Sequence, residues 1–202
     1  MNKQDVIDFF DMLAPTWDNG MVHDDKKIEK ILMNAGVHEG VSVLDVACGT
    51  GVIIPDYFKA GAAHVSAIDI SHEMIKVAAQ KFTDLTETGK LELICGDVEE
   101  YSPDCRFDCI LVYNAFPHFP DGARLVAHLS GLLTPGGILS IAHGMSRSAL
   151  NAHHSGRSKS VSVGLMNETE LADIFSRHLE VTTVISNDEM YQVAGRKGLS
   201  MF

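Results

Sequence analysis

The sequence VLDVACGTG, residues 43–51, joins a short β-type run to a turn made almost wholly of small residues. Asp45 lies near the end of the run, and Gly49 and Gly51 flank a threonine in the turn. Glycine has no Cβ, so it accepts a positive φ and lets another molecule approach the backbone closely. The stretch therefore predicts a buried strand followed by a turn that a ligand approaches.

Two phosphate-binding motifs match this turn only in part. The P-loop pattern GxxxxGK[ST] needs a lysine for the phosphates, and no lysine follows Gly51. The dinucleotide pattern GxGxxG finds its first two glycines in Gly49 and Gly51, but Ile54 stands at the third position, where glycine serves close helix–strand packing. A nicotinamide dinucleotide therefore stays open here as a less favoured ligand.

Strand-type and helical segments alternate along the chain. We expect strands at residues 41–46, 64–68, 91–95, 107–113 and 138–143, and a terminal hairpin at 180–185 and 190–194. We expect helices at 6–13 and 25–35, from the glycine turn to about residue 60, and at 71–82, 121–133 and 167–178. Ser71 and Asn167 are the expected N-caps of two of these helices, and the sequence TPGG at 134–137 predicts a turn. Such alternation indicates a parallel sheet with helices on both faces, which binds ligands beyond the carboxyl ends of its strands.

Composition limits the range of partners. The 202 residues include 16 Lys or Arg and 27 Asp or Glu, for a formal net charge of −11. Proteins that bind a nucleic acid backbone usually present a basic face, so we expect a small-molecule substrate and no nucleic acid. The sequence contains no run of about 18 apolar residues, so we expect no membrane span. The acidic start MNKQDVIDFFDML does not resemble a signal peptide. We therefore expect a cytoplasmic protein.

Cysteines and histidines offer no regular metal motif. Cys105 and Cys109 are spaced CxxxC rather than CxxC, and Cys95 and Cys109 lie in strand-type runs where we expect small core residues. His153 and His154 could join His143 around an ion, but their spacing is irregular. We therefore expect no metal.

VLDVACGTG resembles the first motif of class I S-adenosylmethionine-dependent methyltransferases. Four later segments resemble the following motifs of that family in the same order: HVSAIDISHEMI, ICGDVEE, FDCILVYNAFPHF and LTPGGILSIAH. The resemblance spans residues 41–143. The N-terminal segment FFDMLAPTWD resembles the opening of the small-molecule branch that includes the ubiquinone and menaquinone biosynthesis methyltransferases.

The resemblance implies a doubly wound α/β fold. It implies a seven-stranded sheet in the order 3-2-1-4-5-7-6, with an antiparallel seventh strand and helices on both faces in a three-layer sandwich. We expect residues 1–202 to form one methyltransferase domain. Within it, residues 1–40 would be a helical lid, 41–143 the cofactor-binding core, and 144–202 a substrate-side connection, a helix and the hairpin.

The resemblance also assigns roles to residues at the strand ends. Asp45 would orient the methionine ammonium of S-adenosylmethionine, and Asp69 would accept hydrogen bonds from both ribose hydroxyls. Adenine would lie between Ile70 and Met74, with its amino group donating to Asp97 and its ring accepting from the Val98 amide. The full set of expected cofactor-binding residues is Trp17, Asp45, Ala47, Gly49, Gly51, Asp69, Ile70, Met74, Asp97, Val98 and Asn114.

The acceptor side is less defined. Trp17 and Asp18 would form the lid that excludes water, while His118 and His143 are the expected catalytic bases because histidine titrates near neutral pH. The sequence NAFPHF departs from the Asn/Asp-Pro-Pro-Tyr motif of enzymes that methylate base or glutamine amino groups. We therefore expect methyl transfer to an O, N, S or C atom of a small molecule, with S-adenosylhomocysteine as the product.

Two alternatives remain open from the sequence. The first is a non-catalytic module that binds S-adenosylmethionine, which the motifs alone cannot distinguish from an enzyme. The second is an NAD-dependent dehydrogenase with a degenerate third glycine, which Ile54 and the terminal hairpin disfavour. The sequence leaves the acceptor and the oligomeric state open.

Overall fold

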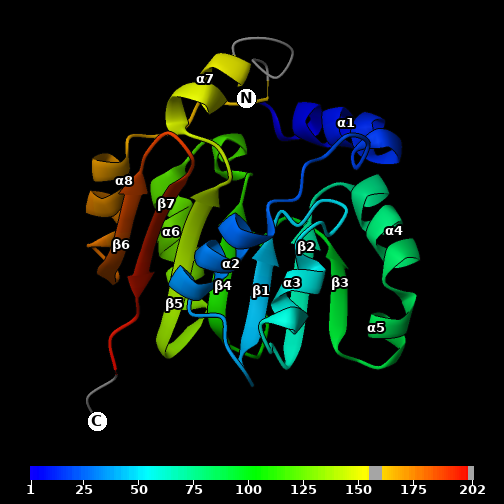
Figure 1. Cartoon of the computed structure of the whole chain (residues 1–202), viewed down its shortest axis with the longest axis horizontal. Coiled ribbons are helices and arrows are strands. Elements are labelled where there is room, and N and C mark those ends of the chain that lie inside the picture. Colours follow the sequence, from blue (N-terminus) through cyan, green and yellow to red (C-terminus); the bar gives the residue numbers. More distant parts are fainter. Residues whose placement is uncertain (155–160, 200–202) are drawn as a thin grey trace.

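A seven-stranded mixed sheet forms the centre of the computed structural model, which describes residues 1–154 and 161–199 apart from the side chains of 153 and 154. The strand order is β3-β2-β1-β4-β5-β7-β6, as predicted (Figure 1). β7 runs antiparallel to both of its neighbours, also as predicted. The strands are β1 Ser42–Val46, β2 His64–Asp69, β3 Leu91–Cys95, β4 Phe107–Tyr113, β5 Leu133–His143, β6 Glu180–Ser186 and β7 Tyr191–Arg196.

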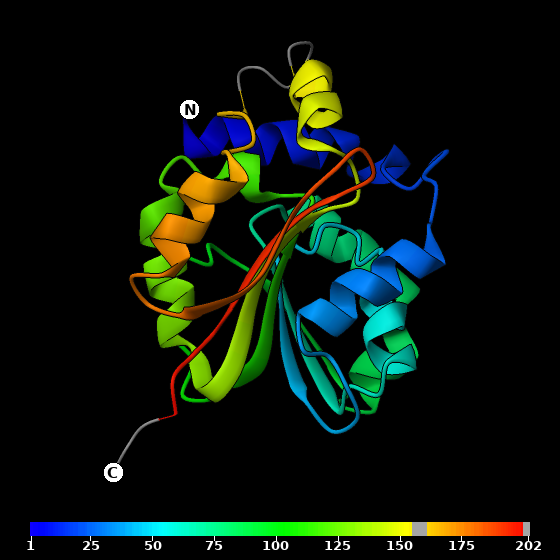
Figure 2. The same ribbon diagram turned by 60° about the vertical axis from the view of Figure 1, so that its left-hand side comes forward.

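Helices cover both faces of this sheet, because side chains alternate between faces along each strand. In β1, Leu44 and Val46 belong to one hydrophobic core, whereas Val43 belongs to the other. α6 (Gly122–Gly131) and α8 (Glu168–Phe175) pack on the first face, and α2 (Asp25–Asn34) and α3 (Ile54–Lys59) pack on the second (Figure 2). The predicted three-layer arrangement is therefore present.

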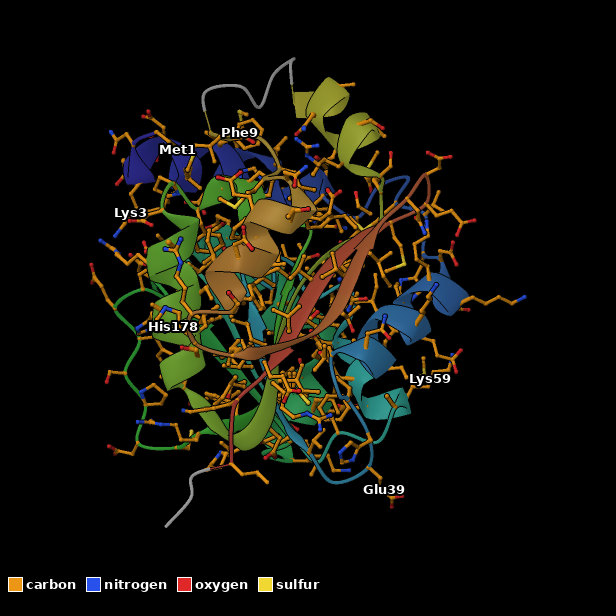
Figure 3. All side chains as sticks on the ribbon, turned by 90° about the vertical axis from the view of Figure 1, so that its left-hand side faces the viewer. Met1, Lys3, Phe9, Glu39, Lys59 and His178 are labelled. Carbon is orange, nitrogen blue, oxygen red and sulfur yellow. The ribbon has the colours of Figure 1, made fainter. Side chains whose placement is uncertain are left out.

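The N-terminal segment lies across the carboxyl ends of the parallel strands. α1 (Lys3–Leu13) and the 3₁₀ helix η1 (Ala14–Thr16) contact α4 (His72–Lys81). Figure 3 shows Met1 and Lys3 at this end of the molecule and Glu39 at the opposite end. The chain thus places its first residues over the edge where the sequence predicts a ligand.

Local signals predicted some boundaries correctly and missed others. Ser71 caps α4, with its Oγ accepting from the Met74 amide at 3.1 Å, and Asn167 caps α8. The predicted turn at TPGG is wrong, because β5 begins at Leu133 and carries these residues in a bulge opposite β4. Cys95 is exposed rather than in the core. Four short helices were not predicted: η1, α5 (Thr83–Glu87), η2 (Phe116–His118) and α7 (Arg147–His154).

Where the chain is described, no helix is long and apolar enough to cross a bilayer.

A buried amide ties α2 to the sheet that carries the site. Gln192 of β7 is fully buried, and its Nε2 donates to the Ile31 carbonyl and to Ser140 Oγ, both at 3.0 Å. Its Oε1 accepts from Asn34 Nδ2 at 2.9 Å. Buried polar groups are costly unless they are hydrogen-bonded, so this side chain fixes how α2 docks.

Truncating this amide should lower stability. Gln192→Ala is expected to reduce the free energy of unfolding by about 2–3 kcal/mol, because it leaves buried partners without hydrogen bonds. Gln80→Ala, the same change on the exposed side of α4, should cost less than about 0.5 kcal/mol. Urea denaturation of both variants measures the difference, and equal losses would contradict this role for Gln192.

Candidate functional site

A cavity of about 410 Å³ opens between the carboxyl ends of the strands and the N-terminal segment. Its walls come from the turn after β1, from the ends of β2, β3 and β4, and from α1 and η2. The expected cofactor-binding residues that line it are Trp17, Asp45, Ala47, Gly49, Asp69, Ile70, Met74, Asp97, Val98 and Asn114. Of the expected set, only Gly51 lies outside the lining.

The two turn glycines have different surroundings. Gly49 has φ +55° and lines the cavity, and a Cβ added there would meet nothing closer than Trp17 Nε1 at 3.8 Å. Gly51 has φ +79°, and a Cβ there would lie 2.7 Å from Ile54 Cδ1 and 2.6 Å from Phe82 Cε2. Gly49 therefore opens the backbone toward the cavity, whereas Gly51 allows close packing beneath the turn.

Asp69 joins the second strand to the glycine turn. Its Oδ2 accepts from the Gly49 amide and its Oδ1 from the Ser71 amide, both at 2.8 Å. Burial raises the pKa of Asp69, while these backbone donors oppose that shift. Since Ser71 itself caps α4, Asp69 is not the helix cap. Its carboxylate lines the cavity with remaining lone pairs.

Asp45 is buried, with 1% of its surface exposed. Within the described residues its Oδ2 has no hydrogen-bond partner, and neither has the hydroxyl of nearby Tyr57. Burial raises the pKa of Asp45 to about 8; Tyr57 lowers it and the charge of Asp69 raises it further. A buried carboxylate at a cavity wall without a counter-charge would be stabilised by a cation bound beside it.

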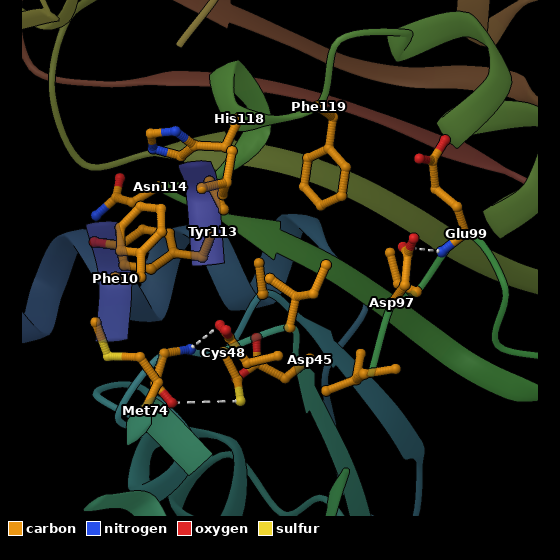
Figure 4. A pocket seen from close by; sticks show the side chains of 18 of the residues that line it. Phe10, Asp45, Cys48, Met74, Asp97, Glu99, Tyr113, Asn114, His118 and Phe119 are labelled. Carbon is orange, nitrogen blue, oxygen red and sulfur yellow. Dashed lines mark hydrogen bonds between the residues drawn. The ribbon is translucent and has the colours of Figure 1, made fainter. Parts of the chain in front are cut away.

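Asp97 lies at the other end of the cavity from Asn114 and His118 (Figure 4). Its Oδ1 accepts from the Glu99 amide at 2.9 Å, and its Oδ2 pairs with Lys3 Nζ from α1. The ion pair raises the pKa of Lys3. Asp97, which we expect to accept a hydrogen bond from the adenine amino group, therefore also contacts the N-terminal helix.

Two further contacts hold the N-terminal segment over the cavity. Asp11 accepts from Ser71 Oγ at 2.5 Å. Asp18 accepts from Thr50 Oγ1 at 2.6 Å and from Lys81 Nζ at 2.8 Å. Asp18 is thus bound directly to the glycine turn.

Asn114 and His118 come from the loop that follows β4. Asn114 has φ +56°, a conformation that is uncommon outside glycine and often marks functional loops. Its Oδ1 accepts from the Gly144 amide at 2.9 Å. His118 lines the cavity and lies edge-to-face with the Phe10 ring, with centroids 4.9 Å apart.

The structure does not bring His143 into this cavity. His143 ends β5, is fully buried and lies outside the lining. It pairs with Tyr191 across the β5–β7 ladder, and the two rings are 6.1 Å apart. The antiparallel hairpin covers this strand end, so the expectation that His143 faces the substrate pocket is not met.

Among the described residues, one cluster of acidic and histidine side chains outside the cavity has the geometry of a possible metal site. His23, Asp25 and Asp56 bring ligand-type atoms within 4.8 Å of one another. His23 Nε2 lies 3.2 Å from Asp56 Oδ2, so the cluster already contains an ion-pair geometry. The side chains of His153 and His154, considered above as metal ligands, lie outside the described residues.

Sequence reasoning missed several residues of this site. Lys3, Phe119 and Arg124 also line the cavity, and Lys81 holds Asp18. Lys3, Lys81 and Arg124 belong to none of the quoted motifs, since each reaches the site from an element whose position only the tertiary structure defines. Phe119 ends the motif FDCILVYNAFPHF, but nothing in the sequence assigned it a role.

The chain is similar in sequence to known methyltransferases. Residues 43–137 match the model of a family described as a methyltransferase domain. The chain is 30% identical over 139 residues to malonyl-[acyl-carrier protein] O-methyltransferase 1 of Ilyobacter polytropus, covering 68% of this chain and 51% of that one. It is 33% identical over 115 residues to a ubiquinone biosynthesis O-methyltransferase of Coxiella burnetii, covering 56% and 46%. The chain thus spans about half the length of these curated relatives.

Solved structures share the fold over nearly the whole chain. The [4+2]-cyclase SpnF superposes with a TM-score of 0.80 at 15% identity, covering 99% of this chain and 98% of that one. The N-methyltransferase NodS of Bradyrhizobium japonicum WM9, in complex with S-adenosyl-L-homocysteine, superposes with a TM-score of 0.72 at 14% identity, covering 95% and 98%. Residues 43–137 therefore match a methyltransferase domain, and the strand order and the solved structures show that the chain has the fold of such methyltransferases.

Proposed function

We propose that this protein binds S-adenosylmethionine in the cavity and transfers its methyl group to a small molecule. The observation that carries the proposal is Asp45, a buried carboxylate at the cavity wall with no hydrogen-bond partner for Oδ2 in the described chain. The ammonium of the methionine moiety supplies the missing donors and charge. Phosphate groups, as in NAD, would add negative charge beside Asp45 and Asp69 instead.

The remaining lining fits the other parts of the same molecule. Asp69 is held by two backbone amides and would accept from the ribose hydroxyls. Ile70 and buried Met74 line the cavity and would flank adenine. The adenine ring would accept a hydrogen bond from the Val98 amide. The adenine amino group would donate to Asp97, which also pairs with Lys3.

The N-terminal segment would act as a lid. Trp17 lines the cavity next to Phe10, with ring centroids 5.6 Å apart, and Asp18 binds Thr50 of the glycine turn. A roof of aromatic side chains excludes water, which strengthens the electrostatic interactions beneath it. The division into lid, core and substrate-side connection stays a proposal on these contacts.

The cofactor, when bound, supplies a methyl group that is already activated on a sulfonium. The protein's residues therefore need mainly to hold donor and acceptor in line, and alignment alone can contribute about 7–11 kcal/mol to rate acceleration. The methyl donor would be held by the glycine turn, by Asp69 and by the loop that carries Asn114. The acceptor would bind at the apolar end of the cavity. Two relatives are named as O-methyltransferases, which favours oxygen as the acceptor atom.

The four free cysteines fit the cytoplasmic location expected from the sequence. The relatives support neither a non-catalytic module nor a dehydrogenase. We therefore carry methyl transfer forward as the proposed function.

Trp17 offers a direct test of ligand choice, since it is the only tryptophan of the chain. S-adenosylhomocysteine is expected to change the Trp17 fluorescence with saturation and to release heat in a titration calorimeter, whereas NAD should do neither. Formation of S-adenosylhomocysteine from S-adenosylmethionine with a panel of small acceptors then tests turnover. Tight NAD binding without binding of S-adenosylhomocysteine would contradict the proposal, and binding without any turnover would favour a non-catalytic module.

Removing the charge of Asp69 should weaken cofactor binding. Asp69→Asn is expected to lower affinity for S-adenosylhomocysteine by about 10- to 100-fold, since hydrogen bonds to a charged group contribute about 1.5–3 kcal/mol. Asp104→Asn, which makes the same change at an exposed position, should leave affinity unchanged. Titration calorimetry measures both variants, and an unaltered affinity in Asp69→Asn would refute the ribose assignment.

Binding should depend on pH through Asp45. In the free protein its pKa is about 8, so the carboxyl is largely protonated at pH 7. A bound ammonium favours the ionised form and lowers that pKa, so binding releases a proton. Affinity for S-adenosylhomocysteine should therefore rise between pH 6 and pH 8 by up to about tenfold per pH unit, and level off above.

Asp45→Asn provides the matched test of this linkage. The amide cannot ionise, so the variant should bind weakly and lose the slope of affinity against pH. It should also raise the thermal stability of the free protein above pH 8, where the wild type carries a buried charge at this position. A wild-type affinity that is flat from pH 6 to pH 8 would contradict the ammonium assignment.

A further inference from the structure

The first turns of α2 and α3 meet at a histidine. His23 lies just before α2, Asp25 is the first residue of α2, and Asp56 lies in the first turn of α3. An acid in the first turn of a helix is common, because it complements the helix dipole. Here, however, the packing of α2 against α3 brings two such acids to the same imidazole. The side chains come from segments that are distant in sequence, so no motif predicts the cluster.

The ligand-type atoms of this cluster are spaced as the ligands of one metal ion are. His23 Nε2 lies 3.2 Å from Asp56 Oδ2 and 3.4 Å from Asp25 Oδ1, and the ligand-type atoms of the two acids lie within 4.8 Å of each other. Zinc binds nitrogen and oxygen at about 2.0–2.2 Å in a tetrahedral arrangement, which places neighbouring ligand atoms about 3.3–3.6 Å apart. The two distances from the imidazole nitrogen are close to that spacing.

Asp56 gives the strongest reason to expect a cation. It is buried, with 9% of its surface exposed, and within the described residues its Oδ2 has no hydrogen-bond partner. His23 Nε2 lies at ion-pair distance from Oδ2, but its hydrogen bond, at 3.3 Å, is to Oδ1. A buried carboxylate oxygen is costly without a hydrogen bond or a positive charge beside it. A metal ion bound to Oδ2 would remove that cost.

The charge of the cluster also favours a divalent ion. In the part of the chain that the structure describes, all ion pairs of Asp25 and Asp56 are with His23. Lys27, in the same turn of α2, pairs with Asp24 instead. With a neutral imidazole, the form that binds metals, the two carboxylates carry two negative charges. Magnesium and calcium prefer oxygen ligands alone, whereas zinc accepts imidazole together with carboxylate.

We propose that His23, Asp25 and Asp56 form a binding site for zinc. The three side chains supply one nitrogen and at least two oxygen ligands, and water completes a tetrahedral set. The side chain of Asp25 is 70% exposed and that of His23 is 36% exposed, so an ion can enter from solvent.

A zinc ion at this site would join two segments that border the cavity. Met21, shortly before His23, lines the cavity, and so does Ile53 in the turn before α3. The ion would therefore hold the end of the N-terminal segment against the helix that follows the glycine turn. Its role is structural, because the cluster lies outside the cavity lining.

Zinc binding by the full-length protein tests this site. After dialysis against a chelator, zinc sulfate should bind at one high-affinity site in a titration calorimeter and raise the melting temperature, because it binds the folded state. Changes behind a metal ligand already cost about 10- to 100-fold in affinity, so loss of a ligand should cost at least that much. His23→Gln and Asp25→Asn, both at exposed positions, should therefore bind zinc at least about tenfold more weakly.

Matched controls and a second metal make the test specific. His38→Gln and Asp104→Asn, the same changes at other exposed positions, should bind zinc as the wild type does. Cobalt bound at the site should show no thiolate charge-transfer absorption, because no cysteine belongs to the cluster.

Four results would overturn the proposal. They are no zinc binding by the wild type, unchanged zinc affinity in His23→Gln and Asp25→Asn, a thiolate band with cobalt, and binding of calcium in preference to zinc. None of these measurements requires S-adenosylmethionine or turnover, so the result is independent of the proposed function.

Discussion

A carboxylate buried without a counter-charge is the constraint around which the site is built. Asp45 lies next to the last residue of β1, an inner strand of the sheet, where its backbone must continue the hydrogen-bond ladder with β2 and β4. Its side chain is thereby removed from water, and burial raises its pKa to about 8. Such a residue destabilises the free protein unless it stays protonated or a cation reaches it. The cavity in front of Asp45 is the route by which a cation can do so.

The other acids of the lining are already satisfied, which distinguishes Asp45 from them. Backbone amides hold Asp69, and Lys3 pairs with Asp97. These contacts make both side chains rigid before a ligand arrives, so little ordering remains to be done on binding. The same contacts join segments that are distant in sequence: Lys3 of α1 pairs with Asp97 after β3, and Asp69 of β2 accepts from the Gly49 amide in the turn after β1. The N-terminal segment is therefore bonded directly to a residue that lines the cavity.

Much of this arrangement follows from local sequence. Asp45, Asp69 and Asp97 each stand at or just past the end of a strand, and parallel strands bring such ends to one edge of the sheet. Ile54 likewise has a local reason: it packs against Gly51 and fills the space that a third glycine would leave. The predicted order of all seven strands was confirmed.

What the sequence did not predict depends on packing between distant elements. TPGG is a turn signal, yet pairing with β4 extends β5 through it as a bulge. His143 stands at a strand end, but pairing with Tyr191 covers it with the terminal hairpin. Lys3 lies in no motif and reaches Asp97 only because α1 folds across the sheet. In each case a contact made far along the chain outweighed the local signal.

The most direct test of this account is a crystal structure with S-adenosylhomocysteine bound. The account predicts that the ligand's ammonium lies within hydrogen-bond distance of Asp45 Oδ2, directly or through one water, with the ribose hydroxyls on Asp69. A ligand whose ammonium points away from Asp45, leaving that carboxylate as it stands in the free protein, would contradict it.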